Sequence, residues 1–138
     1  MKIMKEAVRS TTMGKNAIDN IMPYVSDEEL KKVIEGQKER LETTLQEAGK
    51  ELSAEDREEA EGSKLSKTVL KASSVMSAMM NSEPSHIARM LIEGYEMGIV
   101  SMQKCINDLA KQGDTAPALA VELVKSYDRN IKALRKFL

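Results

Sequence analysis

The order of apolar and polar residues along the chain has the period of an α-helix almost throughout. Apolar residues recur at steps of three and four, which places them on one face of a helix with about 3.6 residues per turn. No internal repeat and no hairpin signal interrupts this pattern. It predicts five helices, at residues 3–22, 27–52, 64–81, 84–112 and 115–137.

Residues that disfavour or cap helices separate these segments. Pro23 ends the first, because a proline ring removes a hydrogen-bond donor and restricts the residue before it. Ser26 and Glu29 form a capping-box pattern, in which the Ser26 hydroxyl accepts the Glu29 amide at the start of the second helix. Asp114 or Thr115 is expected to cap the last helix.

Charge is distributed unevenly along the chain. Residues 27–61 contain 13 acidic and 6 basic side chains, a net charge of −7, although the whole chain carries only −1. Within this region, residues 53–62 have almost no apolar side chain. Such a stretch cannot bury much apolar surface, so it is either a solvated helical extension or a mobile connection, and we favour a partly ordered loop.

The long amphipathic helices predict an all-α fold with one domain over residues 1–138. Each long helix has one dominant apolar face, and such faces are buried most simply in an up-and-down four-helix bundle. The chain would then carry one additional short helix. In the third segment, Met76 and either Met79 or Met80 are expected to face inward.

Helix 84–112 is apolar over more than half of its circumference. Leu91, Gly94, Gly98 and Met102 fall on one side of the helical wheel; Ala88 and Tyr95 extend that side one way, and Met90 and Met97 extend it the other. A helix of this kind is either central or contacts a second chain as well as its own core. Because two-fold dimers are the commonest oligomers, we expect a homodimer. The candidate interface is the methionine-rich face of helices 64–81 and 84–112: Met76, Met80, Met90, Gly94 and Met97.

Composition narrows the class of protein. Three tyrosines, one phenylalanine and no tryptophan argue against base-stacking surfaces, and a net charge of −1 offers no field for nucleic acid or membrane. The N-terminus lacks the apolar region of a signal peptide, and no stretch is long and apolar enough for a membrane span. The single cysteine, Cys105, cannot form an internal disulfide and suits a reducing compartment. We therefore expect a cytoplasmic protein.

A metal centre is the first chemistry that a helical bundle suggests. Di-iron bundles need two Glu-x-x-His pairs and two further glutamates converging in the core. This chain has one histidine, so Glu83 and His86 form the only such pair, at a helix start where acids are common anyway. An iron or manganese site using Glu83, His86 and other acids is therefore kept as an alternative, and no cofactor is expected.

Other chemistry has little support. Ser85 and His86 are adjacent on a helix and do not face one another, and Cys105 is predicted to be an inert thiol inside the core. The methionines are typical of flexible core filler. These features favour a protein without enzymatic activity.

A basic row on the last helix suggests a second alternative. Lys125, Arg129, Lys132 and Lys136 recur at three- and four-residue steps and could contact phosphates of nucleic acid or of the cell envelope. The row has no interleaved aromatic residues, so a solvated face is favoured and no nucleic acid is expected as a partner.

Two runs carry a resemblance to a known family. IARMLIEGYEMGI over residues 87–99 and NIKALRKFL over residues 130–138 resemble small uncharacterised bacterial proteins with a ferritin-like helical bundle. The resemblance implies a four-helix core, a short extra helix and a cytoplasmic setting. The wider superfamily implies metal, but the Glu/His ligand pattern is missing here, so no functional residue is carried over. The sequence thus favours a non-enzymatic bundle that acts through protein–protein contact or self-association.

Overall fold

The computed structural model describes residues 2–62 and 75–138. These residues form helices joined by turns and contain no strand, so the all-α prediction is confirmed for the described part of the chain. The elements are α1 (Lys2–Ile21), the 3-10 helix η1 (Met22–Tyr24), α2 (Glu28–Lys50), α3 (Ala54–Glu61), α5 (Pro84–Lys111), α6 (Ala118–Leu134) and the 3-10 helix η2 (Arg135–Phe137). Residues 75–80 are also helical, whereas the rest of the predicted helix 64–81, up to residue 74, lies outside the described residues.

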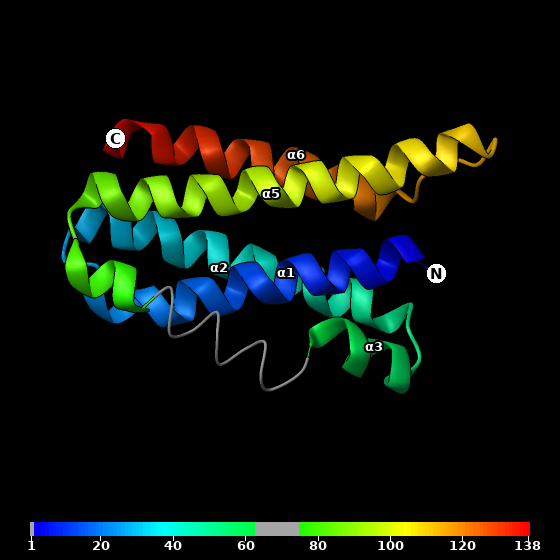
Figure 1. Cartoon of the computed structure of the whole chain (residues 1–138), viewed down its shortest axis with the longest axis horizontal. Coiled ribbons are helices and arrows are strands. Elements are labelled where there is room, and N and C mark those ends of the chain that lie inside the picture. Colours follow the sequence, from blue (N-terminus) through cyan, green and yellow to red (C-terminus); the bar gives the residue numbers. More distant parts are fainter. Residues whose placement is uncertain (1, 63–74) are drawn as a thin grey trace.

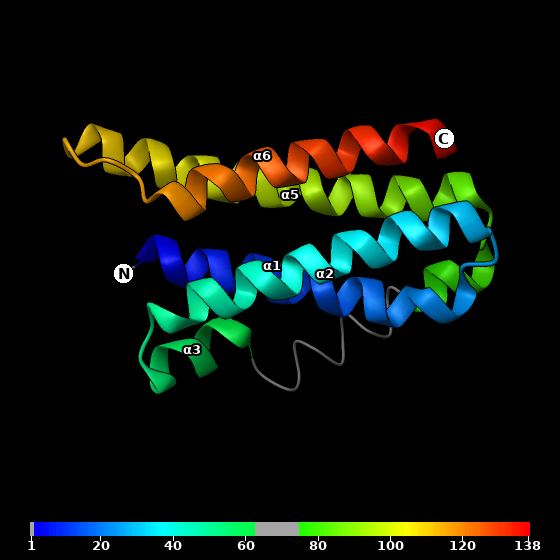
Figure 2. The ribbon, with the colours of Figure 1, turned by 180° about the vertical axis from the view of Figure 1, so that it is seen from behind.

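The four long helices lie side by side, and neighbours run in opposite directions (Figure 1, Figure 2). α1 packs against α2 and α5 packs against α6, and these two pairs meet through contacts of α1 with α5 and of α2 with α6. α3 lies against α1 at the end where the chain begins. Within the described residues, no helix combines the length and the apolar character needed to cross a bilayer.

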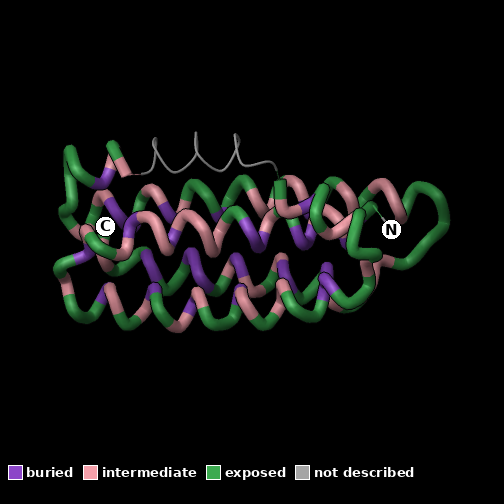
Figure 3. Tube along the Cα trace, turned by 90° about the horizontal axis from the view of Figure 1, so that it is seen from below, coloured by how far each residue is buried: buried purple, intermediate pink, exposed green. Residues whose placement is uncertain are grey.

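The core lies between the inner faces of these helices, where the buried positions gather (Figure 3). The predicted stripe of α1 is buried from Ile3 to Ile21, and Thr11 and Thr12 are buried with it. On α6 the buried stripe ends at Leu134, since the chain tightens into η2 after this residue. Leu138, which follows η2, is exposed.

The connection between α1 and α2 differs from the prediction by one residue. Pro23 lies in η1, as its position at a helix break indicates. The cap of α2 is Asp27 rather than Ser26: its Oδ1 accepts the Leu30 amide at 2.8 Å. A carboxylate is a stronger acceptor than a hydroxyl at the positive end of a helix, which explains the choice.

The acidic stretch forms a helix, so the prediction of a partly ordered loop at 53–62 is wrong. Ser53 caps α3 by accepting the Asp56 amide at 3.1 Å. Lys5 on α1 contacts Asp56 at 3.7 Å and Glu59 at 3.2 Å, which holds α3 against α1. These local and tertiary contacts compensate for the scarcity of apolar side chains on α3.

Arg57 of α3 also covers α2. Its guanidinium lies where a side chain at Gly49 would be, since a Cβ there would come within 2.9 Å of the Arg57 Cζ. The same guanidinium pairs with Glu61 at 3.1 Å. A side chain at position 49 would therefore displace the end of the flexible Arg57 side chain.

The turn from α5 to α6 follows a glycine. Gly113 has a φ of +79°, and the Asp114 amide donates back to the Leu109 carbonyl at 2.9 Å, closing the end of α5. α6 begins only at Ala118, because Pro117 before it has an extended backbone. Neither Asp114 nor Thr115 caps this helix, contrary to the prediction.

Candidate functional site

A groove of about 420 Å³ runs between α1 and α5. Its walls carry methionines and small residues from both helices, with polar side chains toward the rim. The lining includes Ser10, Met13 and Ala17 from α1 and Met90, Gly94 and Met97 from α5. A space of this size is in the range of ligand and peptide sites.

Two glycines of α5 explain why the groove exists and how deep it is. A side chain at Gly94 would meet nothing within 4 Å, so this position leaves the groove open. A Cβ at Gly98 would lie 2.6 Å from the Tyr127 ring, so the ring fills the space that Gly98 leaves. The groove is therefore open beside Gly94 and ends on Tyr127 beside Gly98.

The floor of the groove is tied to α1 by a hydrogen bond. Ser10 Oγ and the Tyr127 hydroxyl are 2.7 Å apart. Burial raises the pKa of Tyr127 to about 12, and the Ser10 hydrogen bond opposes part of that rise. At neutral pH Tyr127 is a neutral polar group and offers no general base.

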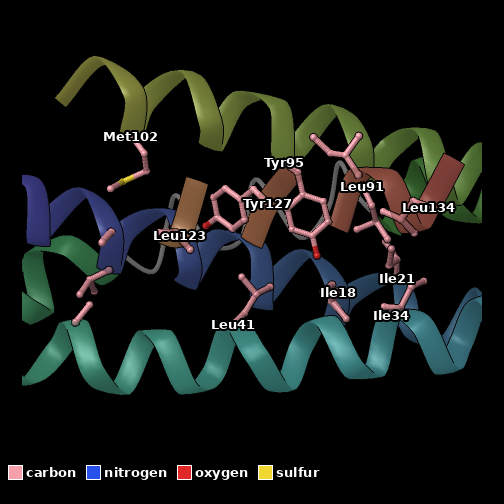
Figure 4. Close-up of a cluster of buried hydrophobic side chains, with 14 of the residues drawn as sticks. Ile18, Ile21, Ile34, Leu41, Leu91, Tyr95, Met102, Leu123, Tyr127 and Leu134 are labelled. Carbon is pink, nitrogen blue, oxygen red and sulfur yellow. The ribbon is translucent and has the colours of Figure 1, made fainter. Parts of the chain in front are cut away.

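A buried polar network lies deeper in the core, beneath the groove. The Tyr95 hydroxyl donates to Gln37 Oε1 at 2.8 Å, and Gln37 Nε2 donates to the Asn130 carbonyl at 3.3 Å. The Tyr95 and Tyr127 ring centroids are 5.4 Å apart (Figure 4). Burial, with a smaller contribution from Tyr127, raises the pKa of Tyr95. The network joins α2, α5 and α6, and its role is structural.

Sequence reasoning missed this network, although a signal was present. Gln37 lies between Ile34 and Leu41 on the apolar stripe of α2, and all three are fully buried. A polar residue on a buried stripe must find a hydrogen-bond partner. Its position therefore indicated a partner across the core, but not which one.

The single histidine contacts a serine at one end of the groove. Ser77 Oγ and His86 Nε2 are 2.9 Å apart, and Ser77 Oγ also lies 3.5 Å from the Met90 sulfur. A serine bonded to an imidazole is the first half of a nucleophilic dyad. In the described part of the chain no carboxylate pairs with His86, so the third member that would orient the ring is missing there.

Glu83 and His86 are not brought together with further ligands. Glu83 is exposed, and its backbone carbonyl accepts the His86 and Ile87 amides at the start of α5. Among residues 2–62 and 75–138, no three His, Cys, Asp or Glu side chains are grouped to hold a metal ion. The metal alternative therefore has no ligand set to build on in this part of the chain.

Of the five predicted interface residues, Met90, Gly94 and Met97 line the groove, and Met76 and Met80 lie on the helical residues 75–80 that precede α5. Met76, Met80 and Met97 are 63%, 82% and 68% exposed, Met90 is half-buried, and Gly94 is exposed. We call these five residues the methionine surface. The prediction that Met76 and Met79 or Met80 face inward is wrong, since all three are exposed and Ala78 is the buried residue of that turn.

The helical wheel of α5 is rotated relative to the prediction. Leu91, Met102 and the flank with Ala88 and Tyr95 are buried as expected, but Gly94, predicted at the centre of that side, is exposed. The apolar pattern does not fix the rotation of α5, because this helix is apolar on several sides. Packing of α5 against α6 fixes it. Cys105 is half-buried on the flank of the stripe, and burial raises the pKa of its thiol.

The basic row on the last helix is largely paired with acids. Arg129 contacts Glu122 at 2.8 Å, and Lys132 contacts Asp128 at 2.9 Å, both within α6. Lys136, in η2, contacts Glu29 of α2 at 2.7 Å. These pairs reduce the positive potential that a phosphate backbone would need.

Comparison of the chain with protein-family models, with curated proteins and with solved structures finds no match. The resemblance to ferritin-like bundles therefore remains a prediction.

Proposed function

We propose that this protein is a non-enzymatic, cytoplasmic helical bundle with ferritin-like up-and-down topology that acts through protein–protein contact, as a homodimer. The observation that supports it most is the exposure of Met76, Met80 and Met97, of which Met97 lines the open groove. The proposal assigns the methionine surface as the contact site.

Methionine suits a surface that receives another helix. Its side chain is unbranched and flexible, so it adapts to the shape of a partner, and an apolar patch exposed on a monomer marks an interaction site. A groove between two helices accepts an apolar helix face through side chains spaced three and four apart. Met90, Gly94 and Met97 have this spacing along α5.

Metal binding and catalysis are less well supported. His86 is already engaged by Ser77, and a catalytic dyad would need an orienting acid and an oxyanion site. Phosphate binding by α6 would require Arg129 and Lys132 to leave their acidic partners. Contact between proteins requires no such rearrangement.

The test is the mass in solution over a range of protein concentrations, by sedimentation velocity or light scattering. We expect a dimer whose population grows with concentration and falls in Met80→Gln and Met97→Gln, which keep side-chain length but add polarity. Leu138→Gln is the matched control, because Leu138 is 63% exposed and is not one of the five residues of the methionine surface. A monomer at every concentration, or a dimer that all three variants leave unchanged, contradicts the proposal.

A further inference from the structure

The outward face of α5 carries an apolar pair between two pairs of charges. Met97 and Val100 are 68% and 69% exposed and lie three residues apart. Arg89 and Glu93 precede them, and Lys104 and Asp108 follow. At 3.6 residues per turn, these six side chains fall within roughly 100° of the helix circumference. They therefore form one strip along the helix.

The order of charges on this strip is self-complementary when the helix is reversed. Read forward, the strip is basic, acidic, apolar, apolar, basic, acidic; read backward, it is acidic, basic, apolar, apolar, acidic, basic. An antiparallel copy therefore meets each of these four charges with its opposite, while Lys111, which lies in the same arc, falls opposite His86. A parallel copy would meet every charge with its like. Two-fold symmetric interfaces require this kind of self-complementarity.

We propose that α5 pairs antiparallel with α5 of a second copy, about a two-fold axis that passes between Met97 and Val100. Met97 then lies against Val100 of the second copy, Glu93 against Lys104, and Arg89 against Asp108, each contact occurring twice. This inference rests on the proposed homodimer and specifies its axis and register. The strip adjoins the methionine surface through Met97, which belongs to both.

Neighbouring registers are disfavoured by charge and by burial. Sliding one helix by four residues in one direction places Arg89 opposite Lys104 and Val100 opposite Glu93. Sliding it by four in the other direction places Glu93 opposite Asp108 and Met97 opposite Lys104. Both shifts oppose like charges and set an apolar side chain against a charge, which is how interfaces reject wrong partners.

The apolar contact and the charges have different roles in this pairing. Met97 and Val100 lose exposed apolar surface, which favours association. The ion pairs are solvent-exposed and contribute little affinity, so they set direction and register instead. Within one chain, Arg89 and Glu93 are 4.0 Å apart at the limit of an ion pair, so both side chains remain able to reach a partner.

A charge-exchange experiment tests the register. Glu93→Lys alone and Lys104→Glu alone each place like charges opposite one another twice, so we expect self-association of each to weaken by roughly tenfold or more. In an equimolar mixture of the two variants, the mixed dimer restores both opposite-charge contacts, so dimer should reappear. Glu58→Lys makes the same charge change on exposed α3 and is expected to leave the dimer unchanged. Sedimentation velocity measures association, and native mass spectrometry of one isotope-labelled variant identifies the mixed dimer.

The outcomes distinguish the register of the α5 pair from the existence of the homodimer. Monomeric single variants and a dimeric mixture support the register. Dimeric single variants, or a mixture that stays monomeric although the unmodified chain dimerises, overturn the register and leave the homodimer standing. An unmodified chain that is monomeric overturns the homodimer and this inference together. Circular dichroism melts of each variant check that folding is unchanged, as expected at exposed positions.

Discussion

The two sides of α5 differ in how completely neighbouring helices cover their side chains. Its inward face is covered: Leu91, Tyr95 and Met102 are buried, and the Tyr95 hydroxyl is bonded to Gln37 of α2. Toward α1 the helix borders a groove lined by Met90 and Met97. The difference shows that apolar side chains on one helix can have two roles, one in holding the fold and one in offering a surface. Substitutions at matched positions can separate these roles.

The largest contrast is expected between two methionines of α5. Met102 is fully buried, so Met102→Ala should lower the free energy of unfolding by about 2–5 kcal/mol through lost burial and the cavity left behind. Met97→Ala removes the same atoms from an exposed position and should change the stability of a single chain by less than about 0.5 kcal/mol. Urea unfolding at low protein concentration measures both. Equal losses would mean that the two sides of α5 are packed alike.

Alkaline pH should lower the stability contributed by the two buried tyrosines, Tyr95 and Tyr127. Burial raises the pKa of Tyr127 from 10.0 to about 12 and raises that of Tyr95 as well, so both bind their protons more tightly in the folded chain. Their contribution to stability is therefore complete below pH about 10 and is lost as the pH rises toward 12. The loss is up to about 1.4 kcal/mol per pH unit for each tyrosine.

Lysines also titrate in this range, so the comparison needs a variant that lacks both phenols. Unfolding at a series of alkaline pH values should show a steeper fall for the unmodified chain than for the Tyr95→Phe/Tyr127→Phe variant. Parallel curves would show that the two hydroxyls keep their ordinary pKa values in the folded state.

The hydroxyls of the two tyrosines should also differ at neutral pH. Tyr95→Phe leaves Gln37 Oε1 without its donor in the core, which should cost about 1–3 kcal/mol. Tyr127→Phe leaves Ser10, which lines the groove and can bond to water, so a smaller loss of about 0.5–1.5 kcal/mol is expected. Thermal or urea unfolding compares the stability losses of the two variants. A larger loss for Tyr127→Phe than for Tyr95→Phe would mean that water reaches the partner of Tyr95 rather than that of Tyr127.

A change of sign is expected between the two glycines. Gly98→Ala places a Cβ 2.6 Å from the buried Tyr127 ring and should destabilise by about 1–3 kcal/mol. Gly94→Ala meets nothing within 4 Å, so the better helix propensity of alanine should stabilise by about 0.5–1 kcal/mol. Melting temperatures measured side by side test this. If Gly94→Ala lowered the melting temperature as Gly98→Ala does, the opening beside Gly94 would be closed in solution.

The long helices could be predicted from the sequence because their apolar period is strong. The stripe of α1 and that of α6 as far as Leu134 follow from three- and four-residue spacing alone. α3 could not be predicted in this way, since Ala60 is its only buried residue. The position of α3 also depends on Lys5, which lies 54 residues before its partner Glu59 in the chain. Local composition carries no information about such a contact.

The candidate site was only partly predictable, for a similar reason. The methionines could be identified as unusual, but α5 is apolar on so many sides that periodicity does not decide whether Gly94 or Tyr95 faces the core. The contact of Ser77 with His86 joins two helices across a turn, and neither residue stands out in the sequence. Rotation of helices and pairing between them are set by packing.

The attachment of α3 has a consequence for how the protein opens. Exposed ion pairs from Lys5 and a single buried residue, Ala60, hold this helix, so high salt should loosen it while the long helices stay folded. Its amide protons would then exchange with solvent ahead of those in the core. A protease would also cut there first, so α3 would act as the weak point through which the chain is degraded.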